Sequence, residues 1–159
     1  MAKESLFNIL NNYIAFEEVK VLDLFAGTGN ISLEFAARKA SSVLSVDLNK
    51  ACIDFISKMA ADLDFKQLTA IQANVFTFLS RPMGGFDVIF ADPPYDLAER
   101  ERIPELVFSN NWLNEEGWLV FEHDKYLNFK EHPFFYEERR YGKIHFSFFT
   151  IQAPDKTGF

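Results

Sequence analysis

The chain has 159 residues, of which 48% are hydrophobic and 19 are phenylalanine, so we expect one domain over residues 1–159 with a well-packed core. A formal net charge of −7 argues against a broad basic surface for nucleic acid. The sequence shows no apolar run of membrane-spanning length and no signal-peptide pattern, and its single cysteine, Cys52, excludes an internal disulfide. These features predict a cytoplasmic protein.

The first half of the chain alternates between helix and strand patterns. Apolar residues at helical spacing predict helices at 4–16, 31–40, 49–63 and 75–79. Apolar runs predict strands at 19–25, 42–46 and 68–72. Asn49 stands at the start of the third helix and is expected to cap it.

The second half continues this alternation and then changes to a hairpin pattern. We expect a buried strand at 88–91, a helix at 98–108 that Pro104 kinks or splits, and a strand at 118–122. The tail at 134–151 alternates around Gly142, which is typical of an antiparallel hairpin. The sequence therefore predicts a mostly parallel α/β sandwich with a C-terminal hairpin.

A glycine-rich segment follows the first strand directly and precedes a helix. It reads Asp-Leu-Phe-Ala-Gly-Thr-Gly-Asn over residues 23–30, the context in which a nucleotide-binding loop occurs. Gly27 can adopt a positive φ, and Gly29 lets the backbone approach a ligand closely. Ser32 stands where a dinucleotide fingerprint has its third glycine, so a dinucleotide is not favoured.

Polar residues mark the carboxyl ends of four successive strands, namely Asp23, Asp47, Asn74 and Asp92. Open α/β sheets bind ligands at this edge. Asp47 is placed to bind ribose hydroxyls, while Asn74 and the Val75 N–H suit the edge of an adenine ring. Taken singly, these features are also explained by a tight turn, a helix cap and a turn former. Taken together they predict a ligand with an adenosine half and a reactive end.

The fourth strand ends in the stretch Asp92-Pro93-Pro94-Tyr95, which contains hydrogen-bond acceptors and an aromatic face but no nucleophile. Proline ends the strand because it has no N–H to donate. Such a loop suits the binding of an exocyclic amine on a planar ring, although Asp-Pro and Pro-Pro also occur in ordinary turns. We expect Gly27 and Tyr95 to line one common cavity.

These motifs resemble those of class I S-adenosylmethionine-dependent methyltransferases, and most closely the bacterial small-subunit ribosomal RNA guanine-N2 methyltransferase (RsmD-like) family. The resemblance lies in Asp47 and in the segments 3–10, 21–29, 76–79, 86–95 and 140–143. It implies a Rossmann-like, mostly parallel seven-stranded sheet. Family members usually carry an N-terminal β-hairpin extension, which this sequence lacks before Lys3.

The resemblance also implies the cofactor, the substrate and the site residues. The cofactor would be S-adenosylmethionine, with no metal, and the substrate would be a guanine of ribosomal RNA. The acidic net charge of the chain favours a partly assembled small subunit as the form in which this RNA is bound. The implied catalytic residues are Asp92, Pro93, Pro94 and Tyr95. The implied cofactor-binding residues are Asp23, Phe25, Ala26, Gly27, Thr28, Gly29, Asn30, Asp47, Leu48, Asn74 and Val75.

Other functions fit the same motifs. An adenine-N6 methyltransferase would use the same amine-binding loop, and a cofactor-binding assembly factor without activity would keep the glycine loop. A protein-glutamine methyltransferase would instead resemble Asn-Pro-Pro-Tyr.

The basic residues of the hairpin and the three histidines are interpreted as structural, with no role in a functional site. Arg139, Arg140 and Lys143 adjoin two glutamates and suggest a solvated hairpin face. The histidines at 123, 132 and 145 share no spacing typical of metal ligands and are expected to be structural.

Overall fold

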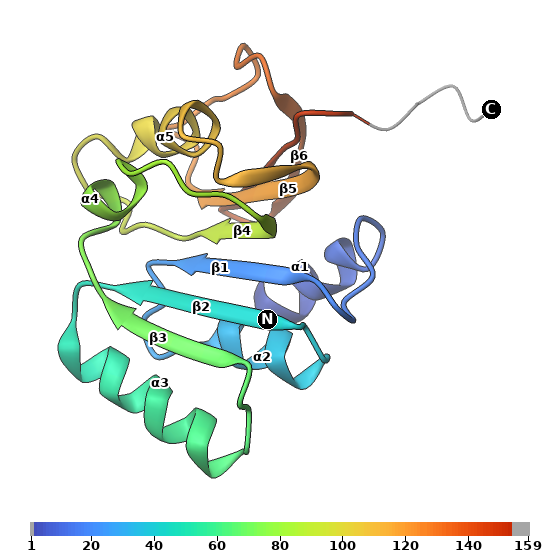
Figure 1. The fold of residues 1–159 in the computed structure, drawn as a ribbon. Helices are drawn as coiled ribbons and strands as arrows, with labels where there is room; N and C mark the ends of the chain where they lie inside the picture. The colour runs from blue at the N-terminus through green and yellow to red at the C-terminus, as the bar shows by residue number, and fades with distance from the viewer. Residues whose placement is uncertain (1, 154–159) are drawn as a thin grey trace.

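The structure, a computed structural model, describes residues 2–153, and these residues form one seven-stranded sheet (Figure 1). The strand order is β3-β2-β1-β4-β5-β7-β6. The strands are β1 (Lys20–Leu24), β2 (Ser42–Asp47), β3 (Leu68–Gln72), β4 (Phe86–Ala91), β5 (Leu113–His123), β6 (Phe135–Tyr141) and β7 (Ile144–Phe149). The first five run parallel, and β7 is antiparallel to both β5 and β6. The predicted mostly parallel sheet with a terminal hairpin is confirmed.

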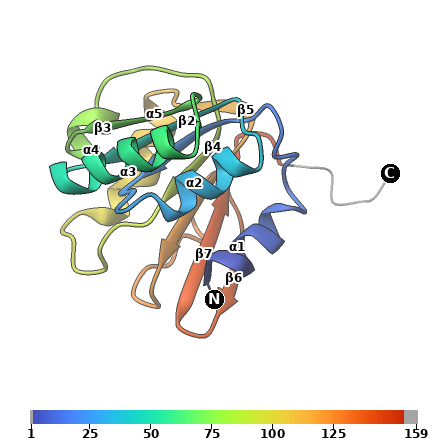
Figure 2. The same cartoon turned by 90° about the horizontal axis from the view of Figure 1, so that it is seen from below.

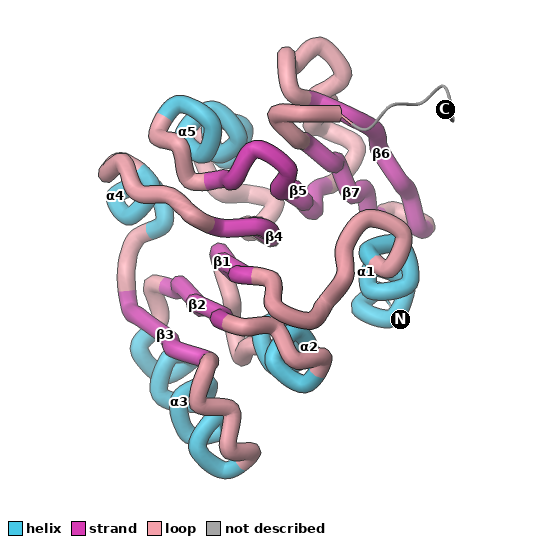
Figure 3. Tube along the Cα trace, turned by 45° about the vertical axis from the view of Figure 1, so that its right-hand side comes forward, coloured by secondary structure: helices cyan, strands magenta, loops and turns pink. Residues whose placement is uncertain are grey.

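Helices cover both faces of the sheet, as the tube in Figure 3 shows. They are α1 (Ala2–Leu10), α2 (Asn30–Ala37), α3 (Lys50–Asp62), α4 (Val75–Leu79) and α5 (Ile103–Ser109), with a 3-10 turn, η1, at Arg100–Arg102. Figure 2 shows α1, α2 and α3 across one face. The shorter helices α4 and α5 pack on the other. No helix within residues 2–153 has the length and apolarity needed to cross a membrane.

The two hydrophobic cores follow from the twofold alternation of strand residues. In β4, Val88 and Phe90 face the core beneath α1–α3, while Ile89 and Ala91 face the core beneath α4 and α5. Side chains that point to opposite faces in turn produce this division. Because both faces are covered, the strand reads as a continuous apolar run.

The ends of several elements differ from the prediction. The first helix ends at Leu10, and residues 11–13 form turns instead of more helix. Pro104 stands in the first turn of α5, where its missing N–H costs no helical bond, and η1 precedes it. The fifth strand begins at Leu113, because Leu113 pairs with Phe86 across an irregularity near Asp87. The sequence does not indicate this start, because the polar residues at 114–116 and Gly117 are not typical of a strand.

The predicted cap of α3 is confirmed and provides a stability test. The Asn49 side chain accepts hydrogen bonds from the N–H groups of Ala51 and Cys52, at 2.9 and 3.2 Å. Asn49→Ala should lower the free energy of unfolding by about 1 kcal/mol, because the first turn loses its acceptor. Urea unfolding measures this change. Lys50→Ala, the control, removes only an exposed ion pair with Asp54 and should cost clearly less.

Candidate active site

A cavity of about 380 Å³ opens where β1, β2, β3 and β4 end. Its lining residues are Phe25, Gly27, Asp47, Leu48, Ala73, Asn74, Val75, Phe76, Asp92, Pro94 and Leu97. Six of the expected cofactor-binding residues and two of the expected catalytic residues thus share one cavity. Sequence reasoning did not assign Ala73, Phe76 and Leu97 to the site. All three are apolar, and only Phe76 belongs to a segment that carries the family resemblance.

The glycine loop bends sharply after β1. Phe25 and Gly27 both have positive φ, 60° and 58°. A positive φ is uncommon outside glycine and occurs often at ligand sites. A Cβ placed on Gly27 would meet no atom within 4 Å, so this glycine borders open space in the cavity rather than packed side chains.

Gly29 has a different role from Gly27. Its φ is 83°, it precedes α2 as the N-cap residue, and a Cβ there would lie 2.7 Å from Ile56 Cγ1 on α3. The second glycine therefore allows close packing of α2 against α3, whereas the first leaves open space in the cavity.

Asp47 holds the loop in place with both carboxylate oxygens. One oxygen accepts the Gly27 N–H at 2.9 Å, and the other accepts the Asn49 N–H at 2.9 Å. Each oxygen keeps a second lone pair for a hydroxyl group. The carboxylate is thus fixed in orientation at the cavity wall.

Asn74 caps helix α4, a role that was not predicted for it from the sequence. Its side-chain oxygen accepts the Thr77 N–H at 3.2 Å at the start of α4. The sequence-based role toward adenine is therefore only partly available, since this amide oxygen already has one donor. Asn74 and Val75 nevertheless both line the cavity.

Asp23 lies below the cavity rather than in its lining. It is 1% exposed and accepts a hydrogen bond of 2.5 Å from the Ser32 hydroxyl, which also contacts the Ser45 hydroxyl at 2.6 Å. Burial, together with the negative charge of Asp92, raises the pKa of Asp23 to about 7. Asp23 thus supports the loop from the core.

Three more expected cofactor residues lie outside the lining. The Ala26 N–H donates to the Val46 carbonyl, and Thr28 is exposed. Asn30 begins α2 and accepts a hydrogen bond from Lys3 at 2.9 Å. These residues shape the loop or border its outer surface.

Asp92 forms a carboxyl pair that the sequence did not indicate. Ala91 and Phe121 are register partners on β4 and β5, so the residues that follow, Asp92 and Glu122, are neighbours. The two carboxyl groups lie close enough to share a proton in a hydrogen bond. Burial and the adjacent acid raise the pKa of Glu122 to about 8, and burial also raises the pKa of Asp92.

The rest of the Asp-Pro-Pro-Tyr stretch divides between two cavities. Pro93 is buried, and its carbonyl accepts no hydrogen bond from residues 2–153. Pro94 lines the cavity that contains Gly27, but Tyr95 lines a second cavity of about 460 Å³. The prediction that Gly27 and Tyr95 share one cavity is wrong. The chain turns at Tyr95 and Asp96, where the Leu97 N–H donates a hydrogen bond to the Pro94 carbonyl at 3.0 Å.

Two of the histidines are neighbours in space despite their separation in sequence. His123 and His145 are register partners on β5 and β7, and with Glu138 they offer three ligand atoms within 4.8 Å of one another. His123 contacts the Asp124 carbonyl and the Ser147 hydroxyl, while His145 contacts Glu138 at 3.2 Å. Hydrogen bonds account for this cluster.

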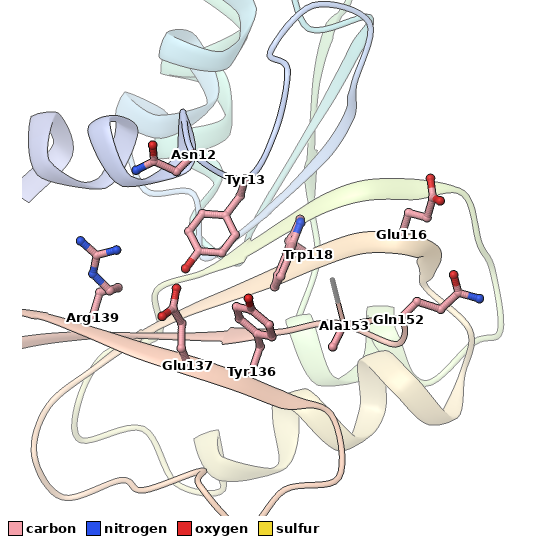
Figure 4. A pocket seen from close by; sticks show the side chains of 9 residues that line it. All are labelled: Asn12, Tyr13, Glu116, Trp118, Tyr136, Glu137, Arg139, Gln152 and Ala153. Carbon is pink, nitrogen blue, oxygen red and sulfur yellow. The ribbon is translucent and has the colours of Figure 1, made fainter. Parts of the chain in front are cut away.

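A larger cavity, about 780 Å³, lies away from the motif residues. Figure 4 shows Tyr13, Trp118 and Tyr136 gathered in it, beside Glu137 and Arg139. Its residues come from the segment after α1, from β5 and β6, and from the segment after β7. Size alone therefore does not locate the functional site.

A family model described as Conserved hypothetical protein 95 matches residues 1–150. The chain belongs to this family. Ribosomal RNA small subunit methyltransferase D of Buchnera aphidicola is 30% identical over 154 residues, which cover 92% of this chain and 76% of that protein. The Haemophilus influenzae protein of the same name is 33% identical over 127 residues, which cover 77% of this chain and 65% of that protein.

Solved structures of methyltransferases have a similar fold. A putative methylase from Haemophilus influenzae has 29% identity and a TM-score of 0.80, and the match covers 96% of this chain and 97% of that one. PKMT2 from Rickettsia typhi, in complex with AdoHcy, has 25% identity and a TM-score of 0.57, with coverage of 69% and 22%. The protein is an S-adenosylmethionine-dependent methyltransferase with a Rossmann-like fold.

The residues of the first cavity fit this cofactor. Gly27 borders open space, Asp47 has lone pairs for ribose hydroxyls, and apolar side chains such as Val75 and Leu97 can enclose an adenine ring.

The elevated pKa of Asp23 predicts a pH-dependent stability. Between its ordinary pKa of 3.8 and the native value of about 7, the folded protein binds more protons than the unfolded chain. The stabilising free energy therefore falls as pH rises across this interval. Asp23→Asn mimics the protonated acid and does not titrate. The difference in melting temperature, variant minus wild type, should therefore become more positive from pH 4 to pH 8. A difference that stays constant with pH would contradict this assignment.

Proposed function

We propose that the protein transfers a methyl group from S-adenosylmethionine to the exocyclic N2 amine of a guanine in small-subunit ribosomal RNA. One observation carries the proposal: Asp92 and Pro94 line the cavity of the glycine loop, and the next residue, Tyr95, lines another cavity. The methyl donor and the guanine that accepts the methyl group would thus lie on either side of one loop. The ribosomal RNA substrate is supported by the names of the relatives.

We expect the whole chain to act as one methyltransferase domain in the cytoplasm. A partly assembled small subunit suits an acidic enzyme as substrate better than naked RNA, because ribosomal proteins already bound there could provide docking contacts.

The first cavity would hold the cofactor. Residues 23–30 hold the methionine end, Asp47 binds the ribose hydroxyls, and the Val75 N–H with apolar neighbours binds the adenine. When bound, S-adenosylmethionine supplies a methyl group from a positively charged sulfur, which keeps the electron pair of the broken C–S bond.

The loop after β4 would orient the acceptor. Tyr95 stacks on a guanine that has left its helix, and the Asp92 carboxylate and Pro93 carbonyl accept hydrogen bonds from its amine. These acceptors favour a pyramidal nitrogen whose lone pair points at the methyl group. Alignment of this kind can lower a barrier by about 7–11 kcal/mol. The Asp92 carboxylate can also receive the proton that the methylated nitrogen must lose.

Glu122 would position Asp92 for this task. Its pKa of about 8 keeps Glu122 protonated at neutral pH, so it donates a hydrogen bond and leaves Asp92 as the charged acceptor. Loss of this proton would place two negative charges side by side.

Asp92→Ala tests the proposed function. Turnover on ribosomal RNA or assembled small subunits should fall at least about 100-fold, because the amine loses its acceptor. Affinity for S-adenosylmethionine, measured by calorimetry, should stay close to wild type. Asp96→Ala, which removes an exposed carboxylate nearby, should keep both properties. Equal loss of turnover and cofactor affinity in Asp92→Ala would assign Asp92 to the cofactor, and methylation of duplex DNA in preference to RNA would refute the substrate.

Glu122→Gln tests the carboxyl pair. The amide keeps a donor toward Asp92 but does not titrate, so activity near neutral pH should persist. Wild-type kcat should fall as pH rises through about 8, where Glu122 loses its proton, and this decline should be weaker in Glu122→Gln. Glu122→Ala should lower kcat at every pH without changing cofactor affinity. The same alkaline decline in wild type and Glu122→Gln would argue against the shared proton.

A further inference from the structure

The second cavity lies beside the loop that follows β4, and it shares no lining residue with the first cavity. Its volume is about 460 Å³, within the range of ligand pockets. Tyr95 forms part of its wall, and so do Lys125 and Tyr126 after β5 and Arg140 and Lys143 of the β6–β7 hairpin. The loop that contains Pro94 and Tyr95 thus separates it from the first cavity.

Strand register brings the hairpin to this place. His123 at the end of β5 pairs with His145 near the start of β7, so the turn at Gly142 lies at the edge where the parallel strands end. This is also the edge of the glycine loop and of Asp92. The hairpin and the segment after β5 therefore extend the active-site edge beyond the cofactor.

The charge of this cavity is opposite to that of the chain. Lys125, Arg140 and Lys143 are exposed, and within residues 2–153 none of them forms an ion pair. Three unpaired cations thus surround one hollow in a protein whose formal net charge is −7. The sequence-based interpretation of a merely solvated hairpin face does not explain this convergence.

The carboxylate in the lining, Asp124, already has a partner. It accepts a hydrogen bond from buried Arg100 at 2.8 Å, and this pair keeps the pKa of Asp124 below its usual range. The same guanidinium lies 5.5 Å from the centre of the Tyr95 ring. Arg100 therefore neutralises Asp124 and supports Tyr95, so the exposed lysines and Arg140 determine the sign of the cavity.

Two aromatic side chains are exposed beside these cations. Tyr95 is 41% exposed and Tyr126 is 77% exposed, with the Lys125 ammonium 5.3 Å from the Tyr126 ring. Exposed aromatic rings among cations are typical of surfaces that bind single-stranded nucleic acid, where bases stack and phosphates pair with lysine and arginine. An acidic peptide would use the cations but not the rings.

We propose that this second cavity binds the single-stranded RNA around the target guanine, an inference that rests on the proposed function. Lys125, Arg140 and Lys143 contact the flanking phosphates, and Tyr126 stacks on a neighbouring base. Tyr95 then receives the target base at the boundary between the two cavities. Single-stranded RNA fits because a base inside a duplex cannot present its amine across the loop.

Salt-dependent binding to RNA tests this surface. The probe is a fluorescein-labelled single-stranded RNA oligonucleotide rich in guanine, and binding is measured by fluorescence anisotropy at several salt concentrations. The double variant K125E/K143E should weaken binding at least about tenfold, and it should reduce the slope of log Kd against log salt by about two, since each lysine contacts about one phosphate. Affinity for S-adenosylmethionine should not change.

Two further variants separate stacking from charge. Tyr126→Ala should weaken RNA binding about tenfold with an unchanged salt slope, because it removes a stacking partner and no charge. Lys66→Glu makes one such charge reversal at an exposed site before β3, at the opposite edge of the sheet, and should bind RNA with a salt slope like wild type. Thermal unfolding is measured to check that all variants are folded.

The outcomes separate this proposal from the proposed function. Wild-type RNA affinity and salt slope in K125E/K143E would overturn the RNA surface, even where methylation of ribosomal RNA is confirmed. A loss of binding in that variant, with no methylation of ribosomal RNA by the wild type, would keep the RNA surface and refute the reaction. Displacement of RNA by poly-glutamate at equal charge concentration would instead show a general polyanion site and overturn the proposal.

Discussion

The hydrogen bond from the Gly27 N–H to the Asp47 carboxylate is the contact on which the site depends. β1 lies between β2 and β4, and the chain proceeds to β2 and β3 on one side before it returns to β4 on the other. The loops after β1 and β4 therefore diverge and leave a crevice. The Asp47 contact fixes one wall of this crevice, and the rigid Asp-Pro-Pro stretch forms the other.

The sequence predicted the order and type of the elements because strand and helix periods are local properties. β3 and α4 agree with the predicted bounds, and the Asn49 cap agrees in its contacts. The start of β5 was missed because pairing with β4 decides it. The polar residues at 114–116 have low strand propensity, yet register with β4 extends the strand through them.

The site was predictable to the extent that it is built from strand ends. Asp47, Asn74 and Asp92 converge because parallel strands end at one edge, which topology alone dictates. Glu122 was missed because a single acid at the end of a strand has no motif, and its proximity to Asp92 depends on the register of β4 and β5. The separation of Tyr95 from Gly27 depends on loop geometry, which two successive prolines do not reveal in a sequence. His123 and His145 show the same limit, since only antiparallel pairing makes them neighbours.

The net charge of the chain is a poor guide to its partner because screening limits how far each charge acts. At physiological salt the Debye length is about 8 Å, so a bound phosphate responds mainly to charges in its immediate surroundings. Several acids elsewhere are compensated locally, as Asp54 and Asp62 are by lysines on α3. Lys125, Arg140 and Lys143 have no such partners in the described chain. An acidic protein with this cationic cavity disfavours non-specific binding to RNA. It still allows strong binding of nucleotides that enter the cavity. A preference for accessible, single-stranded nucleotides would then arise from the same charge distribution that, averaged over the sequence, argued against an RNA substrate.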